Sequence, residues 1–259
     1  MLRKGDLTQG GITGTLLHFT LPMMVGSFLQ QCYNIADTLI VGQCIGAGAL
    51  AAVGSAYTLM VFLISVLLGL AMGSGTVFSL HYGAGNHVAL RRSIFSSFVL
   101  IGIVTLILNV AVFIWLNPIL RLLQVPQDIY GMMHSYLWII FCGIVFTFIY
   151  NFYASLLRAV GDSVTPLWFL AVSVVLNIAL DLFFILQLDW GIQGAAAATV
   201  LAQGVAALCI IIYTYRRRPE LRWHHEDICF DRTCLKEIAS FSTLTCIQQS
   251  VMNLGILMV

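Results

Sequence analysis

The chain has 259 residues, of which 60% are hydrophobic and only 9% are charged, and its formal net charge is +1. This composition excludes a soluble globular domain, whose surface needs many more charged side chains, and it indicates an integral membrane protein. A net charge so close to zero gives no indication of nucleic-acid binding, and in a membrane protein the positions of the charges carry the information.

Seven mostly apolar runs follow one another along the chain, separated by loops that contain Gly, Pro and charged residues. A membrane-spanning helix needs roughly 20 mostly apolar residues, whereas the strands of a membrane barrel are about half as long and alternate in polarity. We therefore expect an all-α membrane protein. The predicted spans lie near residues 15–41, 54–80, 94–116, 133–157, 166–188, 194–215 and 238–259.

Positively charged residues lie almost entirely on one side of the expected membrane. Only Arg121 falls on the side opposite the N-terminus. The eleven Lys and Arg residues on the N-terminal side are at positions 3, 4, 91, 92, 158, 216, 217, 218, 222, 232 and 236. Because cytoplasmic loops carry the excess of Lys and Arg, this asymmetry predicts a multi-pass protein with a cytoplasmic N-terminus.

The first span carries an aspartate inside an otherwise apolar helix. Gln30, Asn34 and Asp37 are spaced at i, i+4 and i+7, so they share one helical face. An aspartate at the centre of a membrane helix costs about 2.5 to 3.5 kcal/mol, so Asp37 needs either a compensating partner or a function. Pro22 and Gly26 lie upstream, where we expect the helix to bend.

Further polar residues lie inside the later spans. Asn177 and Asp181 are one helical turn apart, and they therefore project into the same volume. Thr199 and Gln203 are likewise one turn apart, among small residues that let helices approach closely. In chain order, these polar residues are Tyr136, Asn151, Asn177, Asp181, Thr199 and Gln203.

The chemistry of these groups suggests a site for a hard cation. Two carboxylates, an amide and a hydroxyl offer only oxygen ligands, which suit Na⁺ or H⁺, and no His or Cys accompanies them. We interpret Asp37, Asn177, Asp181 and Thr199 as a coupling-ion site, and we expect no other metal and no cofactor. The alternative is structural: the amides and hydroxyls hydrogen-bond across helices, and one aspartate is protonated.

The last run is still apolar where the sequence ends, from which we expect these residues to belong to a longer protein. A Gln-Gln pair and a following Asn recur after 219 residues, so that Gln30 aligns with Gln249 and Asn34 with Asn253. Six spans separate the two copies, which predicts parallel repeats. We expect a six-helix transmembrane lobe at 1–215, a cytoplasmic linker at 216–237 and the truncated first helix of a C-terminal lobe at 238–259.

Three stretches carry a family resemblance: "PMMVGSFLQQCYNIADTLIVGQCIGAGALAAVGS", "LLRAVGDSVTP" and "NIALD", in this order along the chain. In these stretches the sequence resembles the multidrug and toxic compound extrusion (MATE) transporters. The resemblance implies two six-helix lobes and the export of organic cations and drugs in exchange for Na⁺ or H⁺.

The resemblance also implies roles for particular residues. The cation site of one branch of the family matches Asp37, Asn177, Asp181 and Thr199 in this sequence. Tyr136 and Asn151 match residues of the same cavity, although Ala154 stands near the place of a second Asn. We assign Gln30, Asn34, Tyr136, Asn151 and Gln203 to the substrate cavity.

The stretch "LLRAVGDSVTP" is also interpreted as a tight turn between two helices. Gly161 predicts the end of the first helix and Pro166 the start of the second, with Arg158 and Asp162 at the cytoplasmic mouth. We interpret the Arg216–Arg218 cluster as part of the positive-inside signal.

These observations favour a cation-coupled antiporter of the cell inner membrane, and not an enzyme. Its expected partners are small organic cations, membrane lipids and the missing C-terminal lobe, without nucleic acid. Two alternatives stay open: a lipid-linked oligosaccharide flippase of the same superfamily, for which we expect a more cationic cavity, and a non-transporting fragment. A loop with His224, His225, Cys229 and Cys234 fits no standard zinc finger.

Overall fold

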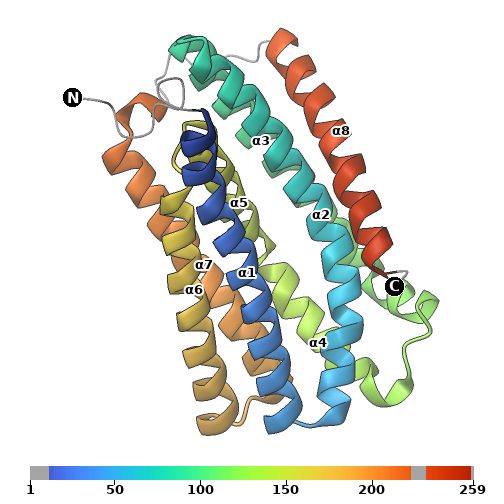
Figure 1. Cartoon of the computed structure of the whole chain (residues 1–259). Helices are drawn as coiled ribbons and strands as arrows, with labels where there is room; N and C mark the ends of the chain where they lie inside the picture. Colours follow the sequence, from blue (N-terminus) through green and yellow to red (C-terminus); the bar gives the residue numbers. More distant parts are fainter. Residues whose placement is uncertain (1–11, 223–231, 258–259) are drawn as a thin grey trace.

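The computed structural model describes residues 12–222 and 232–257, and all the regular structure in these ranges is helical (Figure 1). Eight α-helices occur there, together with a π-helical turn, η1, and a short 3₁₀ turn, η2. Their bounds are α1 Ile12–Cys44, α2 Ala47–Gly83, α3 His87–Leu122, α4 Gln127–Cys142, α5 Ile144–Ala159, α6 Val164–Leu182, η1 Phe183–Gln187, α7 Gly191–Arg217, η2 Pro219–Leu221 and α8 Arg232–Leu257. The helices run alongside one another as a bundle, which confirms the predicted all-α membrane class.

Four helical segments in the described ranges are long and apolar enough to cross a membrane: α2, α3, α6 together with η1, and α7. The pair α4 and α5 passes the same test as a fifth span. Helices α1 and α8 cover the expected first and seventh spans, but they fall outside this set of candidates among the described residues. The chain is therefore a multi-pass membrane protein, with fewer spans identified by length and hydropathy than the seven expected.

The prediction of one continuous helix for the fourth span is wrong. Residues 133–157 are divided between α4 and α5, whose axes differ by 48° at Gly143. A Cβ atom at Gly143 would collide with the side chain of Val200 on α7. The glycine therefore lets α7 approach the chain closely at the point where the span bends.

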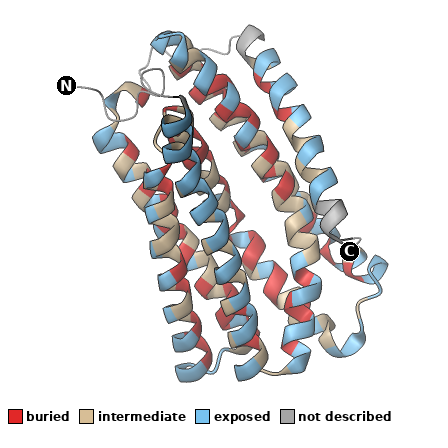
Figure 2. Cartoon of the chain, in the orientation of Figure 1, coloured by how far each residue is buried: buried red, intermediate tan, exposed pale blue. Residues whose placement is uncertain are grey.

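An aromatic cluster fills the centre of the bundle. Phe152 of α5 is fully buried, and its ring centroid lies 5.9 Å from that of Phe78 on α2 and 5.3 Å from that of Phe98 on α3. Both pairs are edge-to-face, an arrangement that contributes about 0.5–1.5 kcal/mol per pair beyond burial. Exposed residues lie on the outer surfaces of the helices and buried residues between them (Figure 2). The cluster thus fixes α2, α3 and α5 to one another.

Helix α1 lies at one side of the bundle, where it packs against α6, and α6 in turn packs against α7. Gly26 of α1 faces α6, since a Cβ atom there would lie 3.6 Å from Leu167 and 3.9 Å from Leu170. Among the α1 residues whose burial is described, only Asp37 and Val41 are buried. An acidic residue is therefore one of the two buried residues in the described part of α1.

Helix α8 packs along α2, at the far edge of the bundle from α1 (Figure 1). Two glycines of α2 allow this approach, because a Cβ atom at Gly73 would collide with the backbone of Ser242 and one at Gly69 would lie 2.5 Å from the Cα of Cys246. Ser242 Oγ also donates to the carbonyl oxygen of Leu70 at 3.3 Å. The contact between α2 and α8 is thus a close backbone contact.

The helix ends differ from the expected domain boundaries. Helix α7 continues to Arg217, beyond the predicted boundary at 215, and α8 begins at Arg232, ahead of the predicted 238. The division into a lobe, a linker and the start of a second lobe stays a prediction. His224, His225 and Cys229, which were considered for zinc, lie outside the described residues, as does the side chain of Cys234.

Candidate functional site

Asp37 and Asp181 lie side by side in the interior of the bundle. Helix α1 carries the first and α6 the second, and the two carboxyl groups come within hydrogen-bonding distance of each other. Asp37 is 8% exposed and Asp181 is fully buried. Two acids that are 144 positions apart in the sequence therefore form one site.

Asn177 connects this pair of acids to α7. In the amide orientation that satisfies both of its ends, Nδ2 donates to Asp181 Oδ2 at 2.9 Å and Oδ1 accepts from the backbone N–H of Thr199 at 3.2 Å. In the opposite orientation, Nδ2 donates to Thr199 Oγ1 at 3.3 Å. The first orientation is favoured, because it pairs both ends of the amide and gives the carboxylate a donor. In both orientations Asn177 bonds to Thr199, so the four residues expected to form the ion site are neighbours.

Sequence reasoning missed Tyr33. Its hydroxyl lies 3.3 Å from Thr199 Oγ1, which itself donates to the carbonyl oxygen of Ala195 at 3.1 Å. Since the threonine proton is already used, the tyrosine hydroxyl donates to Thr199. A signal was present in the sequence, because Tyr33 precedes Asp37 by four residues and so lies on the same face of α1.

Tyr136 of α4 lies beside this cluster, and its role in a substrate cavity stays a prediction. It is 4% exposed, and it lies close enough to Asp37, Asp181 and Tyr33 to interact electrostatically with all three. The site therefore draws residues from α1, α4, α6 and α7. It also lies near the irregular end of α6, since the π-helical turn η1 begins two residues after Asp181. Single π-helical turns of this kind are frequent at functional sites.

Each acid keeps one oxygen without a partner. Among the described residues, Asp37 Oδ1 and Asp181 Oδ1 are buried and accept no hydrogen bond. Burying an ionised carboxylate oxygen without a partner is costly, and two adjacent carboxylates repel each other when both are ionised. A proton or a small cation between them would remove both costs. The oxygen ligands fit Na⁺ or H⁺, and within the described residues no cluster of three His, Cys, Asp or Glu side chains suits another metal.

Two of the residues assigned to the cavity, Gln30 and Asn34, lie on α1 ahead of Asp37. Both are half-buried on α1. Asn34 Nδ2 donates to Gln31 Oε1 on the same helix at 3.1 Å, and its carbonyl oxygen accepts from Thr38 Oγ1 at 2.7 Å. Asn34 lies about one turn and Gln30 about two turns before Asp37, on the same face of α1. Their role in a cavity stays a prediction.

Asn151 and Gln203, also assigned to the cavity, belong to a second polar chain. Thr147 Oγ1 on α5 donates to Gln203 Oε1 on α7 at 3.1 Å, and Asn151 Nδ2 donates to the carbonyl oxygen of Thr147 at 2.8 Å. The bond from Thr147 links α5 to α7 in the way that polar residues hold membrane helices together, whereas the bond from Asn151 lies within α5. Gln203 follows Thr199 by one turn, so α7 carries both polar groups on one face.

The residues expected to bend α1 lie inside a continuous helix. Pro22 is part of α1, which runs without interruption from Ile12 to Cys44. A proline inside a helix removes one backbone hydrogen bond, and the carbonyl four residues earlier is left without its helical donor. Together with Gly26, Pro22 marks the first half of α1 as the weaker part of this helix.

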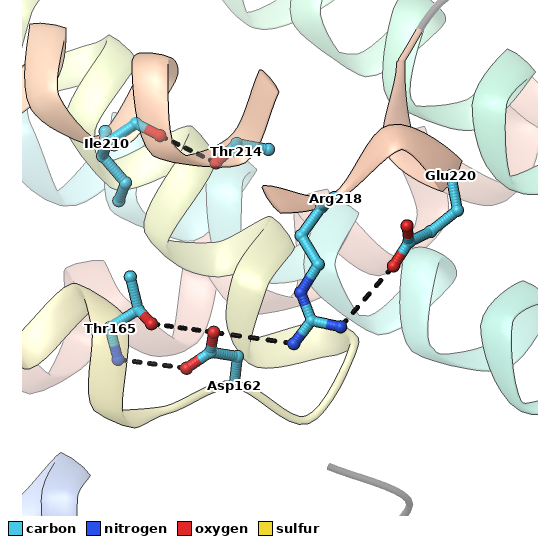
Figure 3. Close-up of polar contacts among 6 residues, drawn as sticks. All are labelled: Asp162, Thr165, Ile210, Thr214, Arg218 and Glu220. Atoms are coloured by element: carbon cyan, nitrogen blue, oxygen red, sulfur yellow. Dashed lines mark hydrogen bonds and ion pairs between the residues drawn. The ribbon is translucent and has the colours of Figure 1, made fainter. Parts of the chain in front are cut away.

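The end of the bundle where α7 finishes carries an ion-paired turn (Figure 3). Asp162 follows α5 and accepts from the backbone N–H of Thr165 at 3.0 Å and from its Oγ1 at 2.8 Å, so it caps the start of α6. Arg218 lies 3.6 Å from Asp162 and 3.5 Å from Glu220. Gly161, with a φ of +87°, makes the turn, as expected. Arg218 therefore forms ion pairs at this turn, and it also belongs to the excess of positive charges predicted on the N-terminal side of the membrane.

Residues 22–183 match the MatE family. The match covers more than half of the chain and includes Asp37, Asn177 and Asp181. The chain belongs to the MATE family. Among curated MATE-like relatives, it is 37% identical over 217 residues to the probable multidrug resistance protein YpnP of Bacillus subtilis, an alignment that covers 84% of this chain and 49% of the relative. It is also 31% identical over 210 residues to the multidrug export protein MepA of Staphylococcus saprophyticus, covering 78% of this chain and 45% of the relative.

A solved MATE structure shares the fold. The chain superposes on the outward-facing conformation of a multidrug resistance MATE transporter of the MOP superfamily with a TM-score of 0.92 and 24% identity. The superposition covers 99% of this chain and 57% of the solved chain. The chain thus spans about half the length of the curated relatives it matches.

Proposed function

We propose that this MATE chain serves a cation-coupled antiporter that exports organic cations and drugs across the cell inner membrane, with its N-terminus in the cytoplasm. The observation that carries the proposal is the buried contact between Asp37 and Asp181, each with an oxygen that lacks a partner. Relatives described as multidrug resistance and multidrug export proteins support the substrate class. The C-terminal lobe that completes the pathway belongs to the same proposal.

The coupling step begins at the two acids. When both carboxylates are ionised, their repulsion and their unpartnered oxygens favour separation of α1 from α6. A proton or Na⁺ bound between them favours the closed contact, with Asn177 and Thr199 orienting the acids. The ion therefore interacts differently with the two arrangements, and a population shift requires this difference.

Helix α1 is suited to be the moving part. Its described side chains are mostly exposed, and apart from Asp37 only Val41 is buried. Pro22 and Gly26 weaken its first half, which lies against α6. A change of charge at Asp37 thus acts on a helix that few buried apolar side chains hold in place. Movement of α1 changes the volume beside Tyr136 and Tyr33, where a bulky organic cation would be bound or released.

The test is efflux of a fluorescent organic cation from vesicles that contain the protein, with Na⁺ and pH gradients imposed separately. Asp37→Asn removes the charge and keeps the shape, and we expect it to abolish ion-driven efflux. Asp189→Asn is the matched control, since Asp189 is exposed and lies outside the cluster, at a φ of +53° that Asn tolerates. Normal ion-driven efflux in Asp37→Asn would refute the proposal, and the gradient that drives transport identifies the coupling ion.

A further inference from the structure

An open polar hollow lies where α3 meets α4, away from the acidic site. Its volume is about 590 Å³, within the range of about 300–1,000 Å³ that is usual for small-molecule pockets. It is lined by Asn117, Arg121, Val125, Gln127, Tyr130 and Gly131. The α3–α4 turn is at the lower right of Figure 1, at the end of the bundle opposite to the end of α7.

The polar groups of this hollow are held in position. Tyr130 donates its hydroxyl hydrogen to Asn117 Oδ1 at 2.8 Å, and its ring stacks on His134 with the centroids 6.4 Å apart. Arg121 is exposed at the end of α3. One acidic residue, Asp128, is exposed in the first turn of α4 but is outside the lining of the hollow. The hollow therefore presents the guanidinium of Arg121 and the amide N–H groups of Asn117 and Gln127 as donors, a set that suits a phosphate group.

The hollow lies at the end of an apolar stripe on α3. Ile103, Val110 and Ile114 are 50% to 65% exposed, and Asn117 and Arg121 follow them at spacings of three and four residues. Residues with this spacing share one helical face. The face thus changes from exposed aliphatic side chains, which suit lipid chains, to a cationic polar group at the membrane boundary.

The positive charge of Arg121 is unusual on this side of the predicted membrane. Arg121 is the single Lys or Arg on its side of the predicted topology, where the positive-inside rule disfavours cations. We propose that the α3–α4 hollow binds the headgroup phosphate of an anionic phospholipid, with Arg121 on the phosphate and an acyl chain along the exposed face of α3. This site is independent of the proposed ion coupling at Asp37 and Asp181.

The binding test uses the purified protein in detergent, titrated with phosphatidylglycerol or phosphatidylcholine, with bound lipid counted by native mass spectrometry. We expect phosphatidylglycerol to bind about tenfold more tightly than phosphatidylcholine, because the choline ammonium of the zwitterionic lipid neutralises its own phosphate and repels Arg121. Arg121→Gln should reduce the two affinities to the same level. Arg217→Gln is the matched control, because Arg217 is exposed at the opposite end of the bundle.

A second variant tests the hollow without changing its charge. A Cβ atom at Gly131 would meet no atom within 4 Å, so Gly131→Leu has open space at its Cβ atom from which to occupy the hollow, and leucine favours the helix. We expect it to weaken phosphatidylglycerol binding about as much as Arg121→Gln does. Unchanged preference in both variants would overturn the proposal, as would an equal loss in Arg217→Gln. If inorganic phosphate displaces phosphatidylglycerol at concentrations similar to those of glycerol phosphate, the hollow is a site for free anions and the assignment to lipid is wrong.

Discussion

Replacing Asp162 with Ala should destabilise the start of α6. Asp162 accepts two hydrogen bonds from Thr165, at 3.0 and 2.8 Å (Figure 3). Loss of a helix cap of this kind costs about 0.5–2 kcal/mol. The ion pair with Arg218, at 3.6 Å between side chains that are 13% and 21% exposed, adds at most about 1 kcal/mol. We therefore expect Asp162→Ala to lower the free energy of unfolding by about 2 kcal/mol.

The assay is thermal unfolding of the purified protein in detergent, followed by circular dichroism. On the scaling of globular domains, a loss of about 2 kcal/mol corresponds to a fall in Tm of roughly 4–8 °C for a chain of this size. Asp162→Asn keeps an oxygen for the backbone N–H of Thr165 and removes the charge, so it should cost less than about 1 kcal/mol.

Two results would refute this reasoning. An unchanged Tm in Asp162→Ala means that the turn does not depend on the cap. An equal loss in Asp162→Asn and Asp162→Ala means that the charge, and not the cap, supplies the stability. A double-mutant cycle with Arg218→Gln then measures the ion pair directly, and we expect a coupling energy below about 1 kcal/mol.

Two further variants test the hydrogen bond of Tyr33 on α1 and the packing of α8 against α2. Tyr33→Phe removes the hydroxyl that lies 3.3 Å from Thr199 Oγ1. It should slow ion-driven efflux by about 2–10-fold, which corresponds to the free energy of one hydrogen bond. An unchanged rate contradicts a role for Tyr33 in the site. Gly73→Leu would place a side chain against the backbone of Ser242. It should lower the free energy of unfolding by about 1–3 kcal/mol and expose α8 to protease. Gly54→Leu on the same helix should do neither, because a Cβ atom there meets nothing within 4 Å. Equal protease resistance in the two glycine variants would show that the close contact between α2 and α8 is dispensable.

The family match includes three of the four residues of the acidic site. The MatE match spans Asp37, Asn177 and Asp181, whereas Thr199 lies beyond its last matched residue. Thr199 enters the site through its contacts with Asn177 and Tyr33. The geometry thus supplies the argument for the fourth member of the cluster.

The sequence by itself determined the helical class, the approximate positions of the apolar helices and the polar residues that share a face of one helix. The relation between Asn177 and Asp181 was readable because the period of an α-helix is local and requires no knowledge of the fold. The same rule would have identified Tyr33, which stands one turn before Asp37. Composition alone was enough to place these helices in a membrane, because the chain has too few charges to cover a soluble surface.

Only the tertiary structure decided which polar faces meet. The contact between Asp37 and Asp181, the bond from Thr147 to Gln203 and the pairing of Arg218 with Asp162 all join helices that are distant in the sequence. The close approach of Val200 on α7 to Gly143, where the span bends, is likewise a contact that local periodicity does not reveal. Helix order and rotation follow from close packing of many side chains at once, so a residue's partners on other helices cannot be read from its own segment.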